Sequence, residues 1–304
     1  MSSSSRLAQL ASHLQPSDVI PRPSPLVGAL LQDQVAIITG SGQGIGRATA
    51  LLFASHGAKV VVSDLDKARS AAVAKEIQDA GGEAIDFAGN VMADDFAEGV
   101  VKAAVDKWGK INHLINNAGF TNDKMLHTTD DATFRMMLEV HTVAPFRLAR
   151  AAAPYLRIKE AEKRENRSIV MIGSTSGNHG NVGQINYAAG KASLIGMTKT
   201  LAKEWGPFGV RANLCAFGWI DTRLTQSKAS GAAIEIDGKK VALGIPGRPA
   251  AGGSGGASVN ATADIPLGRP GRTDEAASAV LFLASGLASY VNGQIIEVTG
   301  GRGI

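Results

Sequence analysis

The segment from Gln34 to Ala54 constrains the fold of this chain more than any other. A short apolar run rich in β-branched residues, Gln34 to Thr39, leads into a glycine-rich turn and then into a helix-forming run from Arg47. Strand, glycine turn and helix in this order open a βαβ unit. Glycines let backbone N–H groups approach a pyrophosphate, and the helix N-terminus adds partial positive charge. The sequence therefore predicts a dinucleotide site at the turn, with these candidate residues: Gly40, Ser41, Gln43, Gly44, Ile45 and Gly46.

A carboxylate follows the second predicted strand. This strand, 58–63, ends at Asp64, about 20 residues beyond the glycine turn, where the adenosine ribose of a dinucleotide would lie. Asp64 would accept hydrogen bonds from ribose hydroxyls and repel a 2′-phosphate, and Leu65 lies beside it. Asp66 can cap the next predicted helix, 67–80, which leaves Asp64 free. The alternative is that Asp64 itself is only a cap. The expected cofactor is NAD, with NADP second.

Tyr187 and Lys191 form a Tyr-x-x-x-Lys pair, with Ser174 thirteen residues upstream of the tyrosine. Residues four apart share one face of a helix, so the ammonium would lie beside the phenol. A nearby cation is expected to lower the pKa of Tyr187 from about 10, which suits a general acid/base. Ser174 would hydrogen-bond the substrate oxygen. A chance pairing on a solvated helix is the alternative for the pair taken alone.

Taken together, these motifs resemble the short-chain dehydrogenase/reductase family, and most closely its 3-oxoacyl-[acyl-carrier-protein] reductase-like members. The resemblance also includes Asn116 to Gly119, the run from Gly183 to Lys191, and the C-terminal stretch from Tyr290 to Gly301. It implies hydride transfer between a nicotinamide and a carbonyl carbon, with Tyr187 as general acid/base. Further cofactor contacts are implied at the positions that match the family: Asn90, Val91, Asn117, Ala118, Gly119, Gly218, Ile220 and Thr222.

Three positions depart from the pattern of that family. His141 stands in place of the catalytic asparagine that holds a water chain from the lysine to solvent, so His141 is either a proton relay or a packed histidine. Phe217 replaces a proline before Gly218. Asn90 replaces an aspartate that meets the adenine, and its amide oxygen can still accept a hydrogen bond.

The expected fold is a single doubly wound α/β domain of Rossmann type, with a mostly parallel seven-stranded sheet flanked by helices. Further strands are predicted at 111–116, 168–173, 210–215 and 294–298, and helices at 93–108, 130–158, 186–205 and 273–285. Residues 33–304 form the predicted catalytic domain, with an extended substrate loop at about 224–267. That loop includes a hairpin, 234–241, and a glycine-rich stretch, 251–256. Residues 1–32 form an extension, either a weak transit peptide or an oligomer arm.

Composition and charge limit the classes of partner and the compartment that we expect for this chain. The net charge is +4, without a basic stripe interleaved with aromatics, so nucleic acid is not an expected partner. No apolar run is long enough to span a membrane. The single cysteine, Cys215, suits a reducing compartment, and we expect a cytoplasmic location, with a mitochondrial or peroxisomal matrix as alternatives. The resemblance implies a homotetramer or homodimer and no metal.

The sequence thus predicts an NAD(P)(H)-dependent oxidoreductase that interconverts a ketone and a secondary alcohol, with a 3-oxoacyl thioester as first candidate substrate. The enzyme alternative is a dehydrogenase of 3-hydroxyacyl-CoA or of another secondary alcohol. The non-enzyme alternative is a catalytically silent NAD-binding sensor or structural subunit. Intact Ser174, Tyr187 and Lys191 argue against the latter, and His141 is its only support.

Overall fold

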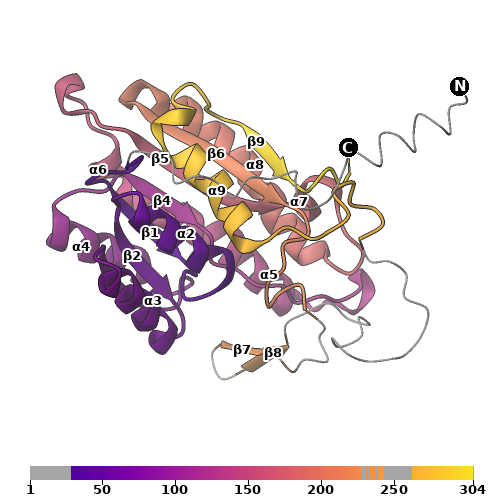
Figure 1. The fold of residues 1–304 in the computed structure, drawn as a ribbon. Coiled ribbons are helices and arrows are strands. Elements are labelled where there is room, and N and C mark those ends of the chain that lie inside the picture. Colours follow the sequence, from indigo (N-terminus) through magenta and orange to yellow (C-terminus); the bar gives the residue numbers. More distant parts are fainter. Residues whose placement is uncertain (1–28, 227–230, 232, 237–238, 243–261, 304) are drawn as a thin grey trace, which may run out of the picture.

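A seven-stranded parallel sheet forms the centre of the molecule (Figure 1). The computed structural model describes residues 29–226, 231, 233–236, 239–242 and 262–303. The strand order is β3-β2-β1-β4-β5-β6-β9. Successive strands are added on one side of β1 up to β3, and on its other side from β4 onwards, so the order switches between β1 and β4. The strands are β1 (Val35–Thr39), β2 (Lys59–Asp64), β3 (Glu83–Ala88), β4 (His113–Asn116), β5 (Arg167–Ser174), β6 (Val210–Phe217) and β9 (Ile295–Val298). The predicted doubly wound α/β fold is confirmed.

Helices cover both faces of the sheet, because successive side chains of each buried strand point to opposite sides. In β1, Ala36 and Ile38 pack with α2 (Gly44–Ser55), α3 (Lys67–Asp79) and α9 (Thr273–Ala284). Val35 and Ile37 pack with α4 (Phe96–Trp108), α6 (Ala144–Leu156) and α8 (Ile185–Trp205). Figure 1 shows α2 and α9 side by side on one face. Each face therefore has its own apolar core.

Strand β3 was not predicted, and its sequence explains why. It lies at the edge of the sheet, and only one of its six residues, Ala84, is buried. Glu83 and Asp86 interrupt any apolar run. An edge strand of this kind is held by its backbone ladder to β2 and carries little hydrophobic signal.

The single helix predicted over 130–158 is wrong in its middle. The structure has α5 (Asp131–Leu138), one π-helical turn (Glu139–Val143) and then α6. Pro145 follows directly, and proline has no N–H to donate to the carbonyl of residue 141. Single π-turns inside helices are frequent at functional sites. This one carries His141.

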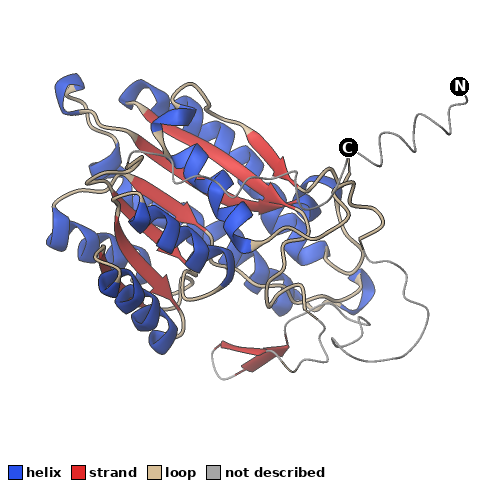
Figure 2. Cartoon of the chain, viewed as in Figure 1, coloured by secondary structure: helices blue, strands red, loops and turns tan. Residues whose placement is uncertain are grey.

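The hairpin predicted in the long substrate loop is present. Strands β7 (Ala233–Ile236) and β8 (Lys239–Ala242) pair antiparallel, and Figure 2 shows them apart from the main sheet. Its Asp-Gly turn, 237–238, and the stretch 251–256 lie outside the described residues. Val241 is buried and packs with Phe120, Met137 and Val140. The hairpin thus packs near the π-helical turn that contains Val140 and His141.

The structure describes the last four residues, 29–32, of the segment that was predicted to be an N-terminal extension. Leu31, assigned to the extension, is fully buried in the core, and its N–H donates to His56 O at 3.0 Å. Leu31 therefore packs with the domain that was predicted to begin at residue 33, while residues 1–28 lie outside the described part. Short 3-10 helices occur at Leu126–Thr128, Ala161–Lys163, Gly206–Phe208 and Gly286–Ala288.

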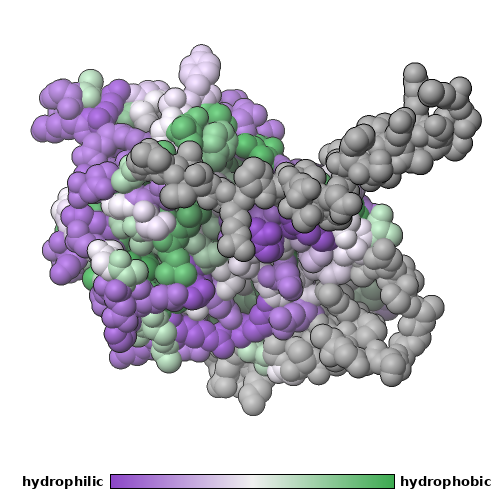
Figure 3. All heavy atoms as spheres, viewed as in Figure 1, coloured by the Kyte–Doolittle hydropathy of each residue, from purple (hydrophilic) through white to green (hydrophobic). Residues whose placement is uncertain are grey.

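The single cysteine lies in the core, and the surface has both hydrophilic and hydrophobic regions. Cys215 is fully buried, and burial raises its pKa to about 12, as expected for a small core residue. Figure 3 shows mainly hydrophilic side chains over α3 and α4, and hydrophobic ones gathered near the upper part of α9. Among the described residues, none of the helices is long and apolar enough to cross a bilayer.

Candidate active site

The glycine turn joins β1 to α2 at the point where the strand order reverses. Gly40 has φ of 63°, and a Cβ there would lie 2.8 Å from Ala118 Cα. A Cβ on Gly46 would overlap the Gly40 carbonyl oxygen. The N-cap of α2, Gln43, makes no side-chain capping bond, so the first N–H groups of the helix remain available to an anion. The turn therefore has the form of the phosphate cradle that the sequence predicts.

The ends of β1 and β4 are locked together beneath this turn. Asn117 Nδ2 donates to Thr39 O and to Gly40 O, both at 2.9 Å. Thr39 Oγ1 accepts from the backbone N–H groups of Asn117 and Ala118, at 3.1 and 3.0 Å. The Asn117-Ala118-Gly119 segment, which follows β4, therefore helps to fix the shape of the glycine turn after the neighbouring strand β1.

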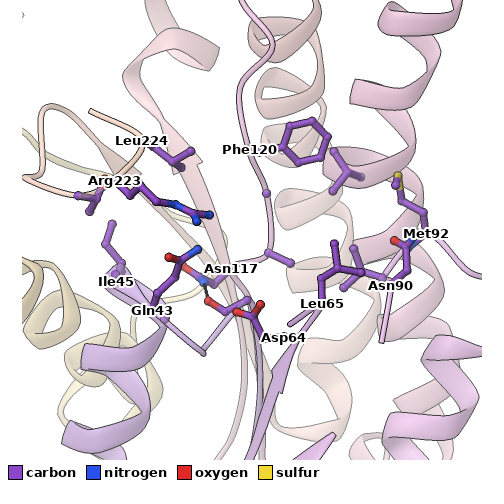
Figure 4. A pocket seen from close by; sticks show the side chains of 18 of the residues that line it. Gln43, Ile45, Asp64, Leu65, Asn90, Met92, Asn117, Phe120, Arg223 and Leu224 are labelled. Carbon is purple, nitrogen blue, oxygen red and sulfur yellow. Dashed lines mark hydrogen bonds between the residues drawn. The ribbon is translucent and has the colours of Figure 1, made fainter. Parts of the chain in front are cut away.

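A pocket opens above the turn (Figure 4). It brings together most of the cofactor residues predicted from the sequence: Gly40, Gln43, Gly44, Ile45, Gly46, Asp64, Leu65, Asn90, Val91, Asn117, Ala118, Gly119 and Thr222. Five predicted cofactor residues are not in its lining: Ser41, Tyr187, Lys191, Gly218 and Ile220. The lining also includes residues that the sequence did not single out: Gly89, Met92, Phe120, Val140, Arg223 and Leu224. An elongated ligand that fits this lining would run from β2 across the glycine turn towards α5 and the π-turn.

Asp64 faces the glycine turn from the end of β2. Its side chain is nearly buried, with Oδ2 accepting from Gly42 N at 2.9 Å and Oδ1 from Asp66 N at 3.1 Å. Asp66 caps α3, as predicted, through Ala68 N and Arg69 N. Asp64 is therefore not free, contrary to the expectation. A carboxylate offers about four lone-pair positions, so acceptor capacity remains for hydroxyl groups.

Two other predicted cofactor residues, Asn90 and Ser41, form hydrogen bonds with nearby backbone groups. Asn90 Oδ1 accepts from Met92 N at 3.0 Å, which shapes the loop after β3. Ser41 is fully buried, its hydroxyl donates to Ile38 O at 2.7 Å, and its N–H donates to Ser63 O at 2.8 Å. Ser41 thus holds the turn in place and presents no free donor to a ligand.

Ser174, Tyr187 and Lys191 come together beside this pocket. Ser174 ends β5 and caps α7 (Thr175–His179), accepting from Ser176 N at 3.2 Å. Tyr187 and Lys191 lie one turn apart near the start of α8. Lys191 Nζ lies 5.7 Å from the centroid of the Tyr187 ring and donates to Ile172 O at 2.7 Å. The predicted helical pairing of phenol and ammonium is therefore present.

The pKa values differ from the expectation. Burial raises the pKa of Tyr187 to about 12, and the hydrogen bond with Ser174 opposes this rise. Burial also lowers the pKa of Lys191 to about 7. The expected lowering of the Tyr187 pKa by Lys191 is thus wrong in direction for this structure. The physical reason is that desolvation penalises both charged forms, and the ammonium is directed at the Ile172 carbonyl.

His141 packs directly against Tyr187. It is fully buried in the π-turn, and its ring lies 5.0 Å from the Tyr187 ring, centroid to centroid, at an interplanar angle of 90°. Its Nε2 is 2.8 Å from Phe120 O, an acceptor, so Nε2 carries the proton. Nδ1 is buried and has no hydrogen-bond partner among the described residues. Burial, with Lys191 nearby, lowers the pKa of His141 well below its ordinary value.

Polar side chains that the sequence did not single out hold the start of α8. Asn186 is fully buried, donates to Asn122 O at 3.0 Å and accepts from Tyr187 N at 2.7 Å. Gln184 accepts from Ser176 Oγ at 2.9 Å and donates to Asp123 at 3.1 Å. Both residues lie in the run from Gly183 to Lys191 that carries the family resemblance, but the sequence assigned them no role. Together they fix the tyrosine relative to Ser174.

Comparison with known proteins agrees with this geometry. The short chain dehydrogenase profile matches residues 34–233, and the profile described as enoyl-(acyl carrier protein) reductase matches residues 248–302. The chain belongs to the short chain dehydrogenase family. The chain is 37% identical to a 3-oxoacyl-[acyl-carrier-protein] reductase of Thermotoga maritima over 271 residues, covering 89% of this chain and 98% of the relative. Similar reductases of Vibrio cholerae and Synechocystis are each 35% identical, covering 89% of this chain and 98% and 97% of the relatives.

Membership of the short chain dehydrogenase family makes the chain an oxidoreductase that acts on a ketone or its alcohol with a nicotinamide cofactor. The cradle fits such a cofactor, because the tight turn leaves no room for a Cβ at Gly40 or Gly46 and α2 offers N–H groups without a side-chain cap there. The predicted fold, family and oxidoreductase class are thus confirmed.

Proposed function

We propose that this chain reduces the 3-oxo group of an acyl thioester with NADH, using Tyr187 as the proton donor. The observation that carries this proposal is the joint placement of Ser174, Tyr187 and Lys191 beside a pocket with a glycine cradle. The printed function of the relatives, 3-oxoacyl-[acyl-carrier-protein] reductase, supports the substrate class. Bound at the cradle, the nicotinamide would supply the hydride.

The residues divide the remaining work by their chemistry. Ser174 would donate its hydroxyl hydrogen to the substrate carbonyl oxygen and polarise it. Tyr187, kept neutral by its raised pKa, would then pass the phenol proton to that oxygen. Lys191, when charged, would stabilise the resulting phenolate electrostatically. Because burial brings the pKa of Lys191 to about 7, its charge varies within the physiological range.

We propose NAD(H) over NADP(H) as the preferred cofactor. Asp64 lies at the end of β2 with little exposed surface, and its carboxylate would repel a 2′-phosphate while accepting from ribose hydroxyls. Its two backbone donors, Gly42 N and Asp66 N, hold the carboxylate in place at the end of β2.

We propose that His141 positions Tyr187 and does not relay protons. Its Nε2–H ends on the Phe120 carbonyl, an acceptor with no proton to pass on. The lowered pKa keeps the imidazole neutral near pH 7, so it contributes no titrating charge there. Its perpendicular contact with the Tyr187 ring restricts the phenol to one orientation.

A substrate panel tests the proposed reaction. Purified protein would be assayed with NADH or NADPH against 3-oxoacyl thioesters, simple ketones and, in reverse, 3-hydroxyacyl-CoA and secondary alcohols. We expect the highest kcat/KM for a 3-oxoacyl thioester with NADH. A higher value for oxidation of a simple secondary alcohol would replace the proposal with the dehydrogenase alternative. Binding of NADH without turnover of any panel member would favour a catalytically silent NAD-binding protein.

A further inference from the structure

Arg223 is the only basic side chain among the described residues that line the pocket. It directly follows Thr222 on the segment after β6, on the wall across from the glycine turn. Figure 4 shows its guanidinium directed towards the middle of the pocket, beside Gln43 and on the same side as Leu224. The only acidic residue in that lining is Asp64. The family pattern from which the cofactor contacts were predicted assigned no role to Arg223.

The guanidinium of Arg223 has no ion-pair partner among the residues that the structure describes. Its Nε is buried and has no hydrogen bond, and the group forms no ion pair with any described residue. Burial and the neighbouring Arg69 lower the pKa of Arg223, while Asp64 and Asp66 oppose that change. Arg223 is half-buried, and its buried Nε is left without an acceptor, which is unfavourable, so an acceptor brought by a ligand would satisfy it.

The position of the preceding residue indicates which ligand group Arg223 would meet. A Cβ built on Gly44 would lie 3.8 Å from the Thr222 methyl, so this segment passes close over the N-terminus of α2. That N-terminus is where a diphosphate is expected to bind. Guanidinium groups bind phosphate oxygens through two parallel N–H donors. The turn and the arginine would thus approach one anion from opposite sides.

We propose that Arg223 binds the diphosphate of the nicotinamide cofactor from the wall opposite the glycine turn. This proposal rests on the cofactor part of the proposed function and is independent of the substrate. The 2′-phosphate of NADP is the other phosphate that Arg223 could meet, because Arg69 and Asp66 lie near it. We favour the diphosphate because the Arg223 segment passes close to the turn at Gly44.

Binding measurements without turnover test this proposal. Dissociation constants for NADH, NADPH and ADP would be measured by calorimetry on wild type, Arg223→Gln and Arg223→Lys. ADP carries a diphosphate and lacks both the nicotinamide and a 2′-phosphate. We expect Arg223→Gln to weaken all three ligands by one common factor, about tenfold to a hundredfold, and Arg223→Lys to recover part of it. Arg69→Gln, which changes a neighbouring guanidinium outside the pocket lining, should leave NADH binding within about twofold of wild type.

The possible results separate the proposals. Unchanged NADH and ADP binding in a folded Arg223→Gln protein would overturn the assignment, and a loss confined to NADPH would reassign Arg223 to the 2′-phosphate. The melting temperature without ligand establishes that the variant is folded. Wild type that binds NADH but reduces no ketone would overturn the proposed reaction and leave the Arg223 proposal standing. Wild type that binds none of the three ligands would overturn both.

Discussion

Gly119 and Gly190 make room for His141 at two different points of its side chain. A Cβ on Gly119 would overlap His141 Cε1 and lie 2.9 Å from Nδ1, whereas a Cβ on Gly190 would lie 2.8 Å from His141 Cβ. His141→Ala removes the ring and keeps Cβ. It should therefore relieve the clash created by Gly119→Ala and leave the one created by Gly190→Ala.

The expected magnitudes follow from how firmly the ring is held. His141 is fully buried and its Nε2 donates to Phe120 O, so the ring cannot swing aside without losing that bond, worth about 0.5–1.5 kcal/mol. Overpacking a buried site costs about 1–3 kcal/mol. We expect Gly119→Ala to lower the free energy of unfolding by about 2–4 kcal/mol in wild type and by under about 1 kcal/mol in His141→Ala. The coupling energy, which is the difference between these two costs, would be about 1–4 kcal/mol.

Denaturant unfolding of the ligand-free protein, followed by circular dichroism at one protein concentration, measures this double-mutant cycle. Gly190→Ala is the matched control, because its cost should be the same in both backgrounds. Equal costs of Gly119→Ala with and without the His141 ring would refute the packing assigned to the ring. Relief of Gly190→Ala by His141→Ala would refute it as well.

Three further predictions concern cofactor choice, pH and assembly. Asp64→Ser should narrow the preference for NADH over NADPH by about tenfold, or 1.4 kcal/mol, in competition binding. Asp66→Ala should leave the preference unchanged and cost about 1 kcal/mol of stability as a lost cap. Burial lowers the pKa of Lys191 from 10.5 to about 7. Between pH 7 and 10.5, Lys191 is therefore mostly protonated in the unfolded chain and mostly neutral in the folded protein. Stability of wild type should therefore rise with pH across that window, by up to about 1.4 kcal/mol per pH unit, and Lys191→Met should lack this contribution in unfolding measured at several pH values. Sedimentation should find a dimer or tetramer that Phe146→Asp weakens, since Phe146 on α6 is 48% exposed, and a wild-type monomer would contradict this.

Features that depend on local sequence could be predicted well. The glycine turn, its flanking strand and helix, and the Asp66 cap are each specified by a few adjacent residues, and the structure has all of them. The π-turn at 139–143 was not predicted, because its apolar pattern reads as one continuous helix and only Pro145 marks the change. Strand β3 was missed because its stability comes from pairing with β2.

Features that depend on tertiary environment could not be predicted. The pairing of Tyr187 with Lys191 follows from helical spacing, but the raised pKa of the phenol follows from burial by distant segments. Asp64 was expected to be free, yet it accepts from Gly42 N across the turn. Arg223 carries no motif, and only the fold directs it into the pocket.

The most direct test of the central claim, that Tyr187 donates the proton in ketone reduction, is single-turnover reduction of a 3-oxoacyl thioester by Tyr187→Phe with NADH bound. Phenylalanine keeps the ring against His141 and removes only the acid. We predict that the rate of the chemical step falls by about 10²–10⁴ while the NADH dissociation constant stays within about twofold of wild type. Tyr155→Phe, at another partly buried tyrosine, should behave as wild type. A Tyr187→Phe protein that reduces the thioester at the wild-type rate would contradict the account.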